Sequence, residues 1–359
     1  MLDLNALLHV LTKSRGSDLH LIVGSPPLIR VDGAIRRVGG QPLSPQDTMQ
    51  VAESIMPPER REDLRRSLHA DFAHSLAGVG RFRVNVFRQR GTTSVVFRRI
   101  RLAGATFEEL ELPEGVRQLS ETPRGLVLVT GPTGSGKTTT LASMINHINA
   151  SKPVHILTVE DPIEVLHQHK MAGINQREIG VDTHSYADAM RAAMRQDPDV
   201  ILIGEMRDPE TVAAAMAAAE TGHLVLSTLH TLDAVETVNR IVDFFPPHQH
   251  HQMRVALASV LQGVISQRLL PRAGGGRIPA VEILINNGRV AERIIDPSAT
   301  AEIHEIIAEG GFYGMQTFDQ SLLSLLTRGL VSIGDAMKTA SNPHDFSLQV
   351  QQAGMKIVA

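Results

Sequence analysis

The feature that most constrains this sequence is a glycine-rich segment, Gly131–Thr138, that follows an apolar run and precedes a helical pattern. The apolar run, Leu126–Thr130, is typical of a buried strand. The glycines allow backbone N–H groups to turn inward around a polyphosphate, and the start of the following helix adds partial positive charge. A strand, such a loop ending in Lys-Thr, and a helix are the context that a phosphate-binding P-loop requires. The sequence therefore predicts that the chain binds ATP or GTP, and disfavours an unrelated glycine-rich turn.

Positions within this loop have separate expected roles. Lys137 is expected to reach the β- and γ-phosphates during hydrolysis, and the Thr138 hydroxyl is expected to hold Mg²⁺. The residues expected to bind the nucleotide are Gly131, Pro132, Thr133, Gly134, Ser135, Gly136, Lys137, Thr138 and Thr139.

Length and composition limit the class of protein. The 359 residues exceed the ~250–300 that one core usually supports, which favours two domains. With 35 Lys and Arg against 38 Asp and Glu the net charge is −3, so composition carries no basic signature of nucleic-acid binding. The chain has no cysteine, which excludes disulfides and cysteine-based zinc sites. It shows neither a signal-peptide layout nor the ~20-residue apolar run of a membrane helix, so we expect a cytoplasmic protein.

The order of patterns along the chain predicts two domains and a linker. Residues 1–101 are typical of a small α+β domain, and residues 102–124 carry glycine and proline without sustained periodicity, which predicts the linker. In residues 125–359 strands alternate with helices, which predicts a mostly parallel sheet covered on both faces. Here a long helix is expected at residues 248–269 and a strand at 278–285, in an otherwise helical carboxyl-terminal part.

One strand of the small domain carries arginines on a single face. A period of two places the apolar side chains of residues 81–87 on one side and Arg81 and Arg83 on the other. The pattern leaves two interpretations equally open, a solvated basic face and a phosphate-facing surface supplied to a nucleotide site. Further arginines add to this patch: Arg88, Arg90, Arg98, Arg99 and Arg101.

Acidic and histidine side chains follow strands downstream of the P-loop. Glu160 and Glu205 each end an apolar strand, and two such acids after a P-loop favour roles in holding Mg²⁺ and orienting the attacking water. His223 and His230 flank the strand 224–227, and both are candidates for the nucleotide site. Because this strand is expected near the P-loop, His230 at its carboxyl end is placed to contact the γ-phosphate. A structural hydrogen-bonding role is the alternative for a single histidine.

Longer motifs resemble one family. The segment Met194–Asp208 resembles the signature of bacterial type II/IV secretion ATPases. Over nearly its full length the chain is similar to the PilT branch of that family, the type IV pilus retraction motors. The other segments that resemble family motifs are 17–21 and 26–33 in the amino-terminal domain, 156–164 as the aspartate box, 221–231 as the histidine box, and 314–322 as a late segment of the retraction branch.

The resemblance implies a RecA-like P-loop ATPase domain, a smaller PAS-like α+β amino-terminal domain and a homohexamer that uses ATP and Mg²⁺ to retract pili. It implies that Glu160 and Glu205 divide metal binding and water activation, with neither task assigned to either. It also implies that Arg81 and Arg83 act in trans at a subunit boundary. The expected location is the cytoplasmic face of the inner membrane, with a pilus platform protein as partner and no nucleic acid.

Other functions within and outside this family differ from pilus retraction in particular sequence features. Retraction motors usually carry an Ala-Ile-Arg-Asn-Leu-Ile-Arg-Glu-like segment, whereas residues 289–296 read Arg-Val-Ala-Glu-Arg-Ile-Ile-Asp, which weakens the retraction-specific interpretation and leaves the ATPase interpretation intact. A PilU-like accessory motor shares the motifs and stays open. Pilus-assembly and secretion ATPases generally resemble one another in a longer amino-terminal region and a four-cysteine element, and neither is found here. A switch GTPase needs an Asn-Lys-x-Asp segment and a DNA motor an aromatic, basic groove, and the sequence supports neither.

Overall fold

A computed structural model describes residues 2–31, 33–102 and 104–355. The chain divides into two units, one made of Met1–Leu102 with Glu164–Leu166 and the other of Ala103–Ile163 with His167–Ala359. The division differs from the predicted one, because residues 104–124 belong to the second unit instead of forming a linker. Helix α4 (Glu114–Glu121) in this segment buries Val116 and Leu119 in the core of the second unit. Its amphipathic pattern spans only two turns, which is too short to give residues 102–124 a sustained helical periodicity.

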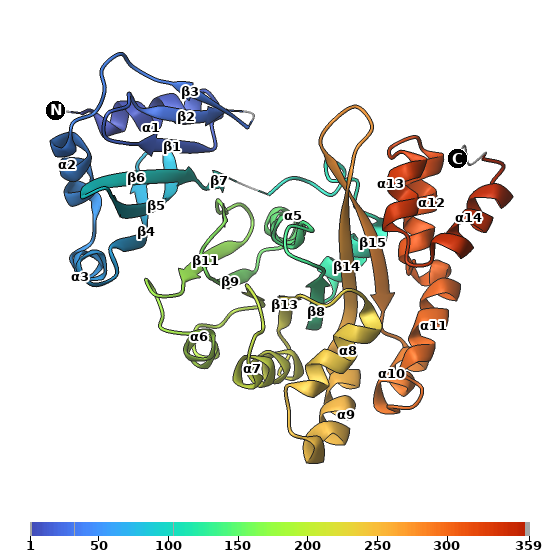
Figure 1. Cartoon of the computed structure of the whole chain (residues 1–359). Helices are drawn as coiled ribbons and strands as arrows, with labels where there is room; N and C mark the ends of the chain where they lie inside the picture. The colour runs from blue at the N-terminus through green and yellow to red at the C-terminus, as the bar shows by residue number, and fades with distance from the viewer. Residues whose placement is uncertain (1, 32, 103, 356–359) are drawn as a thin grey trace. The chain divides into compact units, whose positions relative to one another are not determined.

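The first unit is built on a six-stranded antiparallel sheet with the strand order β3-β2-β1-β6-β5-β4 (Figure 1). The predicted alternation in β5 is confirmed, because Phe82, Val84 and Val86 are fully buried while Arg83 is half exposed. The elements are α1 (Leu4–Lys13), β1 (Asp18–Leu21), β2 (Leu28–Val31), β3 (Ala34–Arg37), α2 (Pro45–Ile55), α3 (Pro58–Ser67), β4 (His69–Leu76), β5 (Gly80–Gln89) and β6 (Thr92–Arg99), with β7 (Arg101–Leu102) paired in parallel to β10 (Val165–Leu166).

The second unit contains a seven-stranded sheet with the order β11-β9-β12-β13-β8-β14-β15. All neighbouring strands run parallel except β15, which is antiparallel to β14. The prediction of a mostly parallel sheet is thus confirmed. The strands are β8 (Gly125–Thr130), β9 (His155–Glu160), β11 (Gly173–Glu178), β12 (Val200–Ile203), β13 (Leu224–Leu229), β14 (Leu261–Pro271) and β15 (Arg277–Ile285).

Helices cover both faces of this sheet. Successive side chains of β8 point to opposite faces, so Leu126 and Leu128 enter one core cluster and Val127 and Val129 the other. A strand buried on both sides therefore reads as a continuous apolar run. In Figure 1, α5 (Lys137–Ser151) lies above the sheet. The helices below it are α6 (Tyr186–Ala193), α7 (Pro209–Glu220), α8 (Ala234–Asp243) and α9 (His250–Val260).

The long helix predicted for residues 248–269 is wrong beyond residue 260. Helix α9 ends at Val260, and the chain continues directly as β14. A short apolar run fits a buried helix or a buried strand equally well. Strand pairing makes this run a strand, because β14 lies between β8 and β15 and hydrogen-bonds to both. The strand predicted at 278–285 is present as β15.

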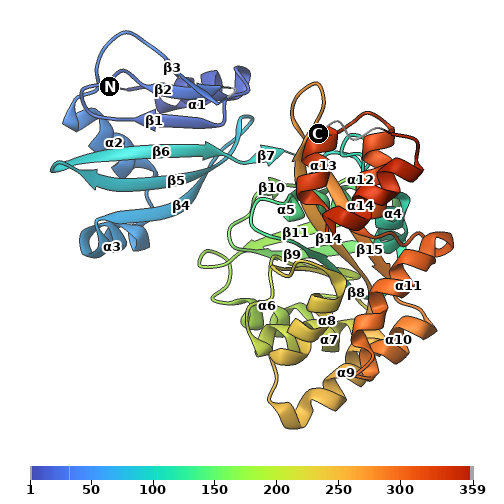
Figure 2. The same cartoon turned by 45° about the vertical axis from the view of Figure 1, so that its right-hand side comes forward.

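The carboxyl-terminal part is helical, as predicted. A separate core cluster joins Phe318, Leu322 and Phe346 to Leu270 and Ile278 of the β14–β15 hairpin, and Figure 2 shows α12, α13 and α14 gathered together. The elements are α10 (Gly288–Ile295), η2 (Thr300–Glu302), α11 (Ile303–Glu309), η3 (Gly310–Tyr313), α12 (Phe318–Thr327), α13 (Ile333–Thr339) and α14 (Pro343–Gln352), with η1 (Pro247–Gln249) before α9. None of the helices in the described part of the chain is long and apolar enough to cross a membrane.

Candidate functional site

The carboxyl ends of β8, β13, β12 and β9 meet at one edge of the second sheet, where parallel α/β sheets bind their ligands. The predicted P-loop leaves β8 at this edge and leads into α5. Gly131, Gly134 and Gly136 have φ of 135°, 83° and 97°, a region that side chains with a Cβ rarely adopt. A Cβ at Gly131 would also lie 2.4 Å from the backbone oxygen of Gln267 on β14. The loop therefore needs glycine for both conformation and space.

Polar groups of this loop fit a bound phosphate chain. Lys137 Nζ donates to the backbone oxygens of Gly131 at 2.7 Å and Pro132 at 3.1 Å, which keeps the ammonium inside the curve of the loop. The hydroxyl of Ser135 is buried, and no group in the described part of the chain hydrogen-bonds to it. Such an orphaned buried group costs free energy unless a ligand satisfies it. A phosphate oxygen would fill this role. Thr138 follows in the first turn of α5, and a hydroxyl, a carboxylate and phosphate oxygens are the donors that Mg²⁺ takes.

Glu160 ends β9 and is held by two neighbours. Its Oε1 accepts hydrogen bonds from the hydroxyl of Thr158 at 2.6 Å and from the side-chain amide of Gln176 at 3.2 Å. Gln176 comes from β11, the edge strand next to β9. Residue Glu160 as a whole is 9% exposed, so its side chain has little freedom to turn. Sequence reasoning missed Gln176, because only strand pairing brings it beside Glu160.

Glu205 follows β12 and contacts two cationic or polar groups. Its Oε1 lies 2.6 Å from Arg207 Nη2, and its Oε2 lies 3.5 Å from His230 Nε2. The glutamate side chain is 13% exposed, whereas the histidine is 53% exposed. Since Leu229 pairs in register with Thr130, His230 leaves β13 at the level where the P-loop leaves β8. The structure therefore brings Glu205, His230 and the P-loop to one edge.

His223 lies at the opposite end of β13. Its backbone oxygen accepts from the N–H of Gly125, the first residue of β8, and its Nδ1 lies 2.9 Å from the backbone oxygen of Ala218. The six residues of β13 span ~20 Å at ~3.3 Å each. The structure therefore does not bring His223 to the P-loop of its own chain. Residues that flank a strand on either side lie at opposite ends of it, so β13 does not bring both histidines to the P-loop of the same chain.

Tyr186 was missed by sequence reasoning and lies among the acidic groups. A Cβ on Gly204, which precedes Glu205, would be 2.9 Å from the tyrosine hydroxyl. Burial, followed by the negative charges of Glu205 and Asp161, raises the pKa of Tyr186 above its ordinary value. The phenol therefore stays protonated and is a hydrogen-bond donor at this edge. A tyrosine in the first turn of a helix, after the N-cap Ser185, carried no signal for this placement.

Arg81 and Arg83 belong to β5 of the first unit. Arg83 Nε lies 3.8 Å from Asp71 Oδ1, and its side chain is 50% exposed. Elsewhere in the predicted guanidinium patch Arg98 has a structural role, because its Nε donates to the buried carboxylate of Asp18 at 2.9 Å. The patch thus contains both structural and exposed arginines.

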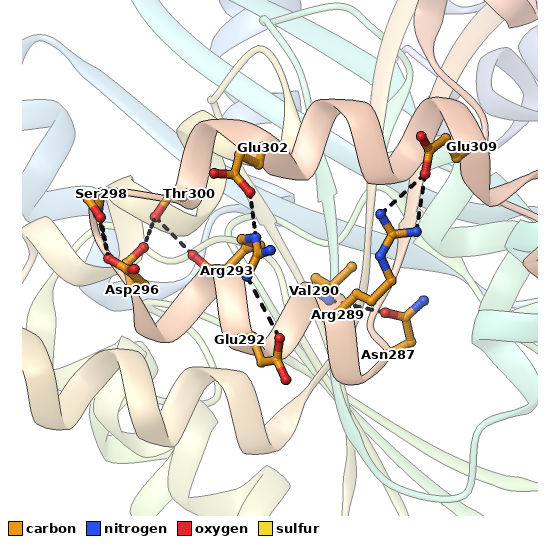
Figure 3. Close-up of polar contacts among 10 residues, drawn as sticks. All are labelled: Asn287, Arg289, Val290, Glu292, Arg293, Asp296, Ser298, Thr300, Glu302 and Glu309. Carbon is orange, nitrogen blue, oxygen red and sulfur yellow. Dashed lines mark hydrogen bonds and ion pairs between the residues drawn. The ribbon is translucent and has the colours of Figure 1, made fainter.

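The segment that departs from the retraction motors forms α10 (Figure 3). Val290 and Ile294 are buried in the core, and two arginines on the outer side pair with glutamates of neighbouring elements. Arg289 lies 3.1 Å from Glu309 of α11, and Arg293 lies 2.7 Å from Glu302 of η2. Half-exposed pairs of this kind contribute ~0–1 kcal/mol each, so α10 is held mainly by its buried side chains.

Comparison with known proteins gives the family. The model of the family described as "Type II/IV secretion system protein" matches residues 3–311. The chain belongs to this family. It is 46% identical over 345 residues to the type IV pilus retraction ATPase PilT of Pseudomonas aeruginosa, covering 96% of this chain and 100% of that protein. It is 47% identical over 322 residues to a twitching motility protein of Neisseria gonorrhoeae, covering 89% and 86%.

Solved structures give the fold. A crystal structure of the pilus retraction motor PilT with bound ADP superposes with a TM-score of 0.88 at 46% identity, covering 96% of this chain and 99% of that one. The predicted RecA-like ATPase fold with a small α+β amino-terminal domain is therefore confirmed. The chain is also 40% identical over 351 residues to the type IV pilus ATPase PilU of Pseudomonas aeruginosa, covering 98% and 92%.

Proposed function

We propose that this chain is a motor that hydrolyses ATP to retract type IV pili, and so to drive twitching motility. The observation that carries the proposal is the single edge at which the P-loop, Glu160, Glu205 and His230 meet. Whole-length similarity to a retraction ATPase supports the pilus as the load.

The residues at this edge suggest a division of labour. The P-loop N–H groups, Ser135 and Lys137 bind the phosphate chain, and Lys137 neutralises charge that develops on the transferred phosphoryl group. Thr138 would hold Mg²⁺, which lowers the charge repulsion against an attacking water. We assign Glu205 to the metal shell, because β12 is one strand closer than β9 to the P-loop strand β8. Glu160, fixed by Thr158 and Gln176, then orients the water.

The proposal includes an assembly. The chain works as a homohexamer at the cytoplasmic face of the inner membrane, docked on the pilus platform protein. Arg81 and Arg83 of one subunit complete the phosphate site of the next, which would couple hydrolysis to movement between subunits. Half-exposed Arg83 retains the freedom that such a contact needs.

Deletion of the gene tests retraction against assembly. Cells that carry excess surface pili and have lost twitching support a retraction motor, whereas cells without pili would refute it. A second experiment addresses the alternative of an accessory retraction motor, for which the similarity to PilU is the argument. The chain is expressed alone in a strain that lacks every retraction ATPase. Restored twitching identifies a primary motor, and ATP hydrolysis without twitching identifies an accessory one.

A further inference from the structure

A row of buried polar side chains crosses three strands below the nucleotide edge. Thr130, the last residue before the P-loop, donates from its hydroxyl to the hydroxyl of Ser266 on β14 at 2.9 Å. Ser266 pairs in register with Glu282 on β15. Glu282 Oε1 in turn accepts the backbone N–H of Ala234, the first residue of α8, at 3.0 Å. The row therefore leads from the strand that carries the P-loop to the helix that follows His230.

Glu282 is an unexpected residue for this position. It is 2% exposed, and its neighbours along β15 are the buried apolar residues Val281, Ile283 and Leu284. Burial raises the pKa of Glu282 to about 7. A buried carboxyl group costs free energy that an apolar side chain of the same size would avoid. Packing alone therefore does not explain a glutamate here.

Among the side-chain hydrogen bonds of the described residues 231–237, the bond from Ala234 is the one that reaches another part of the chain. Asp233 caps α8 by accepting from the N–H of Glu236 at 2.8 Å, and Glu236 accepts from the N–H of Leu232 at 2.7 Å. These bonds stay within six residues and move with the helix. The bond from Ala234 to Glu282 spans 48 residues and attaches the start of α8 to the sheet. His230 lies four residues before this attachment.

Charged groups from several elements face Glu282. Asp233 before α8 and Asp319 of α12 add negative charge, while Arg268 of β14 adds positive charge. Arg268 is itself fixed, since its guanidinium lies 3.9 Å from the ring centre of Phe318 and its Nη1 donates to the backbone oxygen of Thr339 at 2.7 Å. The surroundings of the carboxyl group are thus set by the sheet and the carboxyl-terminal helices.

We propose that Glu282 is a positioning residue for ATP hydrolysis, which holds the loop between His230 and α8 in register with the P-loop without touching the nucleotide. The inference rests on the role proposed for His230 beside Glu205. In this role the Glu282 carboxyl group, without contacting His230, keeps the His230 imidazole in a fixed position relative to the P-loop. Misplacing a group at a reacting centre by ~1 Å costs up to ~10²-fold in rate.

Two substitutions separate this task from a general structural one. Glu282→Met keeps the volume, removes the acceptor and removes the buried charge, so the fold is expected to survive. Its kcat for ATP is expected to fall ~10-fold while KM for ATP stays within ~2-fold. Glu282→Gln keeps an acceptor for the Ala234 N–H and is expected to retain kcat within ~3-fold. Thermal unfolding and ADP binding of both variants serve as controls for folding.

A double mutant connects the effect to His230. Because both residues act through the same loop, His230→Ala combined with Glu282→Met is expected to be no slower than His230→Ala alone. A Glu282→Met enzyme with wild-type kcat, a Gln variant as slow as the Met variant, or fully additive losses would each overturn the inference. If His230→Ala itself hydrolyses ATP normally, the role proposed for His230 is wrong, and the role proposed for Glu282 is wrong as well. A slow His230→Ala enzyme beside a normal Glu282→Met enzyme refutes the inference alone.

Discussion

The two ends of β13 each carry a histidine, and only one of them lies at the nucleotide edge. His230 at the carboxyl end is 3.5 Å from Glu205, a side chain from another strand. His223 at the amino end contacts Ala218 in the last turn of α7, the helix that precedes its own strand. The same residue type on the same strand thus has a long-range partner at one end and a local partner at the other. Strand direction, and not distance along the sequence, decides which histidine can meet a phosphate.

The contrast extends to the two edges of the whole sheet. At the amino edge Asp199 accepts the backbone N–H of His155 at 2.8 Å, and such side chains serve to hold loops. At the carboxyl edge Glu205 lies 3.5 Å from His230, and no group among the described residues hydrogen-bonds to the buried hydroxyl of Ser135. The carboxylate of Asp199 is thus used within the sheet, whereas the hydroxyl of Ser135 is placed for a ligand.

The largest difference is expected between the two lysines at the ends of α5. Lys137 starts the helix inside the P-loop, whereas Lys152 caps its other end and donates to the backbone oxygen of Glu121 at 2.9 Å. Lys137→Ala should reduce ATP hydrolysis below detection, since it removes the charge that stabilises the transition state. The Lys152→Ala variant should hydrolyse ATP within ~2-fold of the wild-type rate. The hydrogen bond that it loses contributes ~0.5–1.5 kcal/mol to stability and takes no part in hydrolysis. Steady-state phosphate release measures both, and equal losses would contradict the edge assignment.

The next largest effect is expected if a second subunit contributes arginines to the phosphate site at the carboxyl edge. Arginine supplied to a phosphoryl-transfer site is worth ~10³–10⁵ in rate. Replacing both Arg81 and Arg83 by alanine should therefore abolish most activity. Co-assembly of this double variant with Lys137→Ala should restore part of it, because mixed rings contain interfaces with an intact P-loop and intact arginines. Mixed rings no more active than either parent would return these arginines to the role of a solvated face.

Removing the charge of either glutamate gives a smaller loss. Glu205→Gln and Glu160→Gln should each bind ATP but hydrolyse it at least ~10²-fold more slowly, a barrier increase of about 2.7 kcal/mol. Asp199→Asn at the amino edge is the matched control and should leave kcat unchanged. Single-turnover hydrolysis separates binding from chemistry. Normal rates in both glutamine variants would remove these carboxylates from the mechanism.

The two histidines give the most direct test of the comparison. His230→Ala should slow hydrolysis ~10-fold or more, as expected for loss of a polar group beside the reacting phosphate. His223→Ala should leave kcat of the assembled ring near wild type, with at most a small loss of thermal stability from its bond to Ala218. A large kcat effect at His223 would show that it reaches a nucleotide after all, and by geometry that nucleotide would belong to another subunit.

The sequence predicted the parts of this site that depend on local pattern. The P-loop and the buried strands before Glu160 and Glu205 follow from spacing over a few residues. The contacts of Gln176, Tyr186 and Glu282 did not, because they depend on which strands and helices become neighbours. The error at residues 261–269 has the same origin, since only the partners β8 and β15 distinguish a strand there from a helix.

The smallest effect concerns stability and comes from the buried carboxyl group below the nucleotide edge. In the folded chain burial raises the pKa of Glu282 to about 7, from its ordinary value of 4.5. Between these values the folded state holds a proton that the unfolded state has lost, so the free energy of unfolding falls as pH rises. The loss is about 3 kcal/mol at most and is complete above pH ~7. Glu282→Gln cannot ionise and should lack this loss. Denaturant titrations at pH 5 and pH 8 should therefore show the variant gaining stability relative to wild type at the higher pH. An equal difference at both pH values would mean that the folded chain ionises this carboxyl group at its ordinary pKa, so that the carboxylate is charged in both titrations and burial does not raise its pKa.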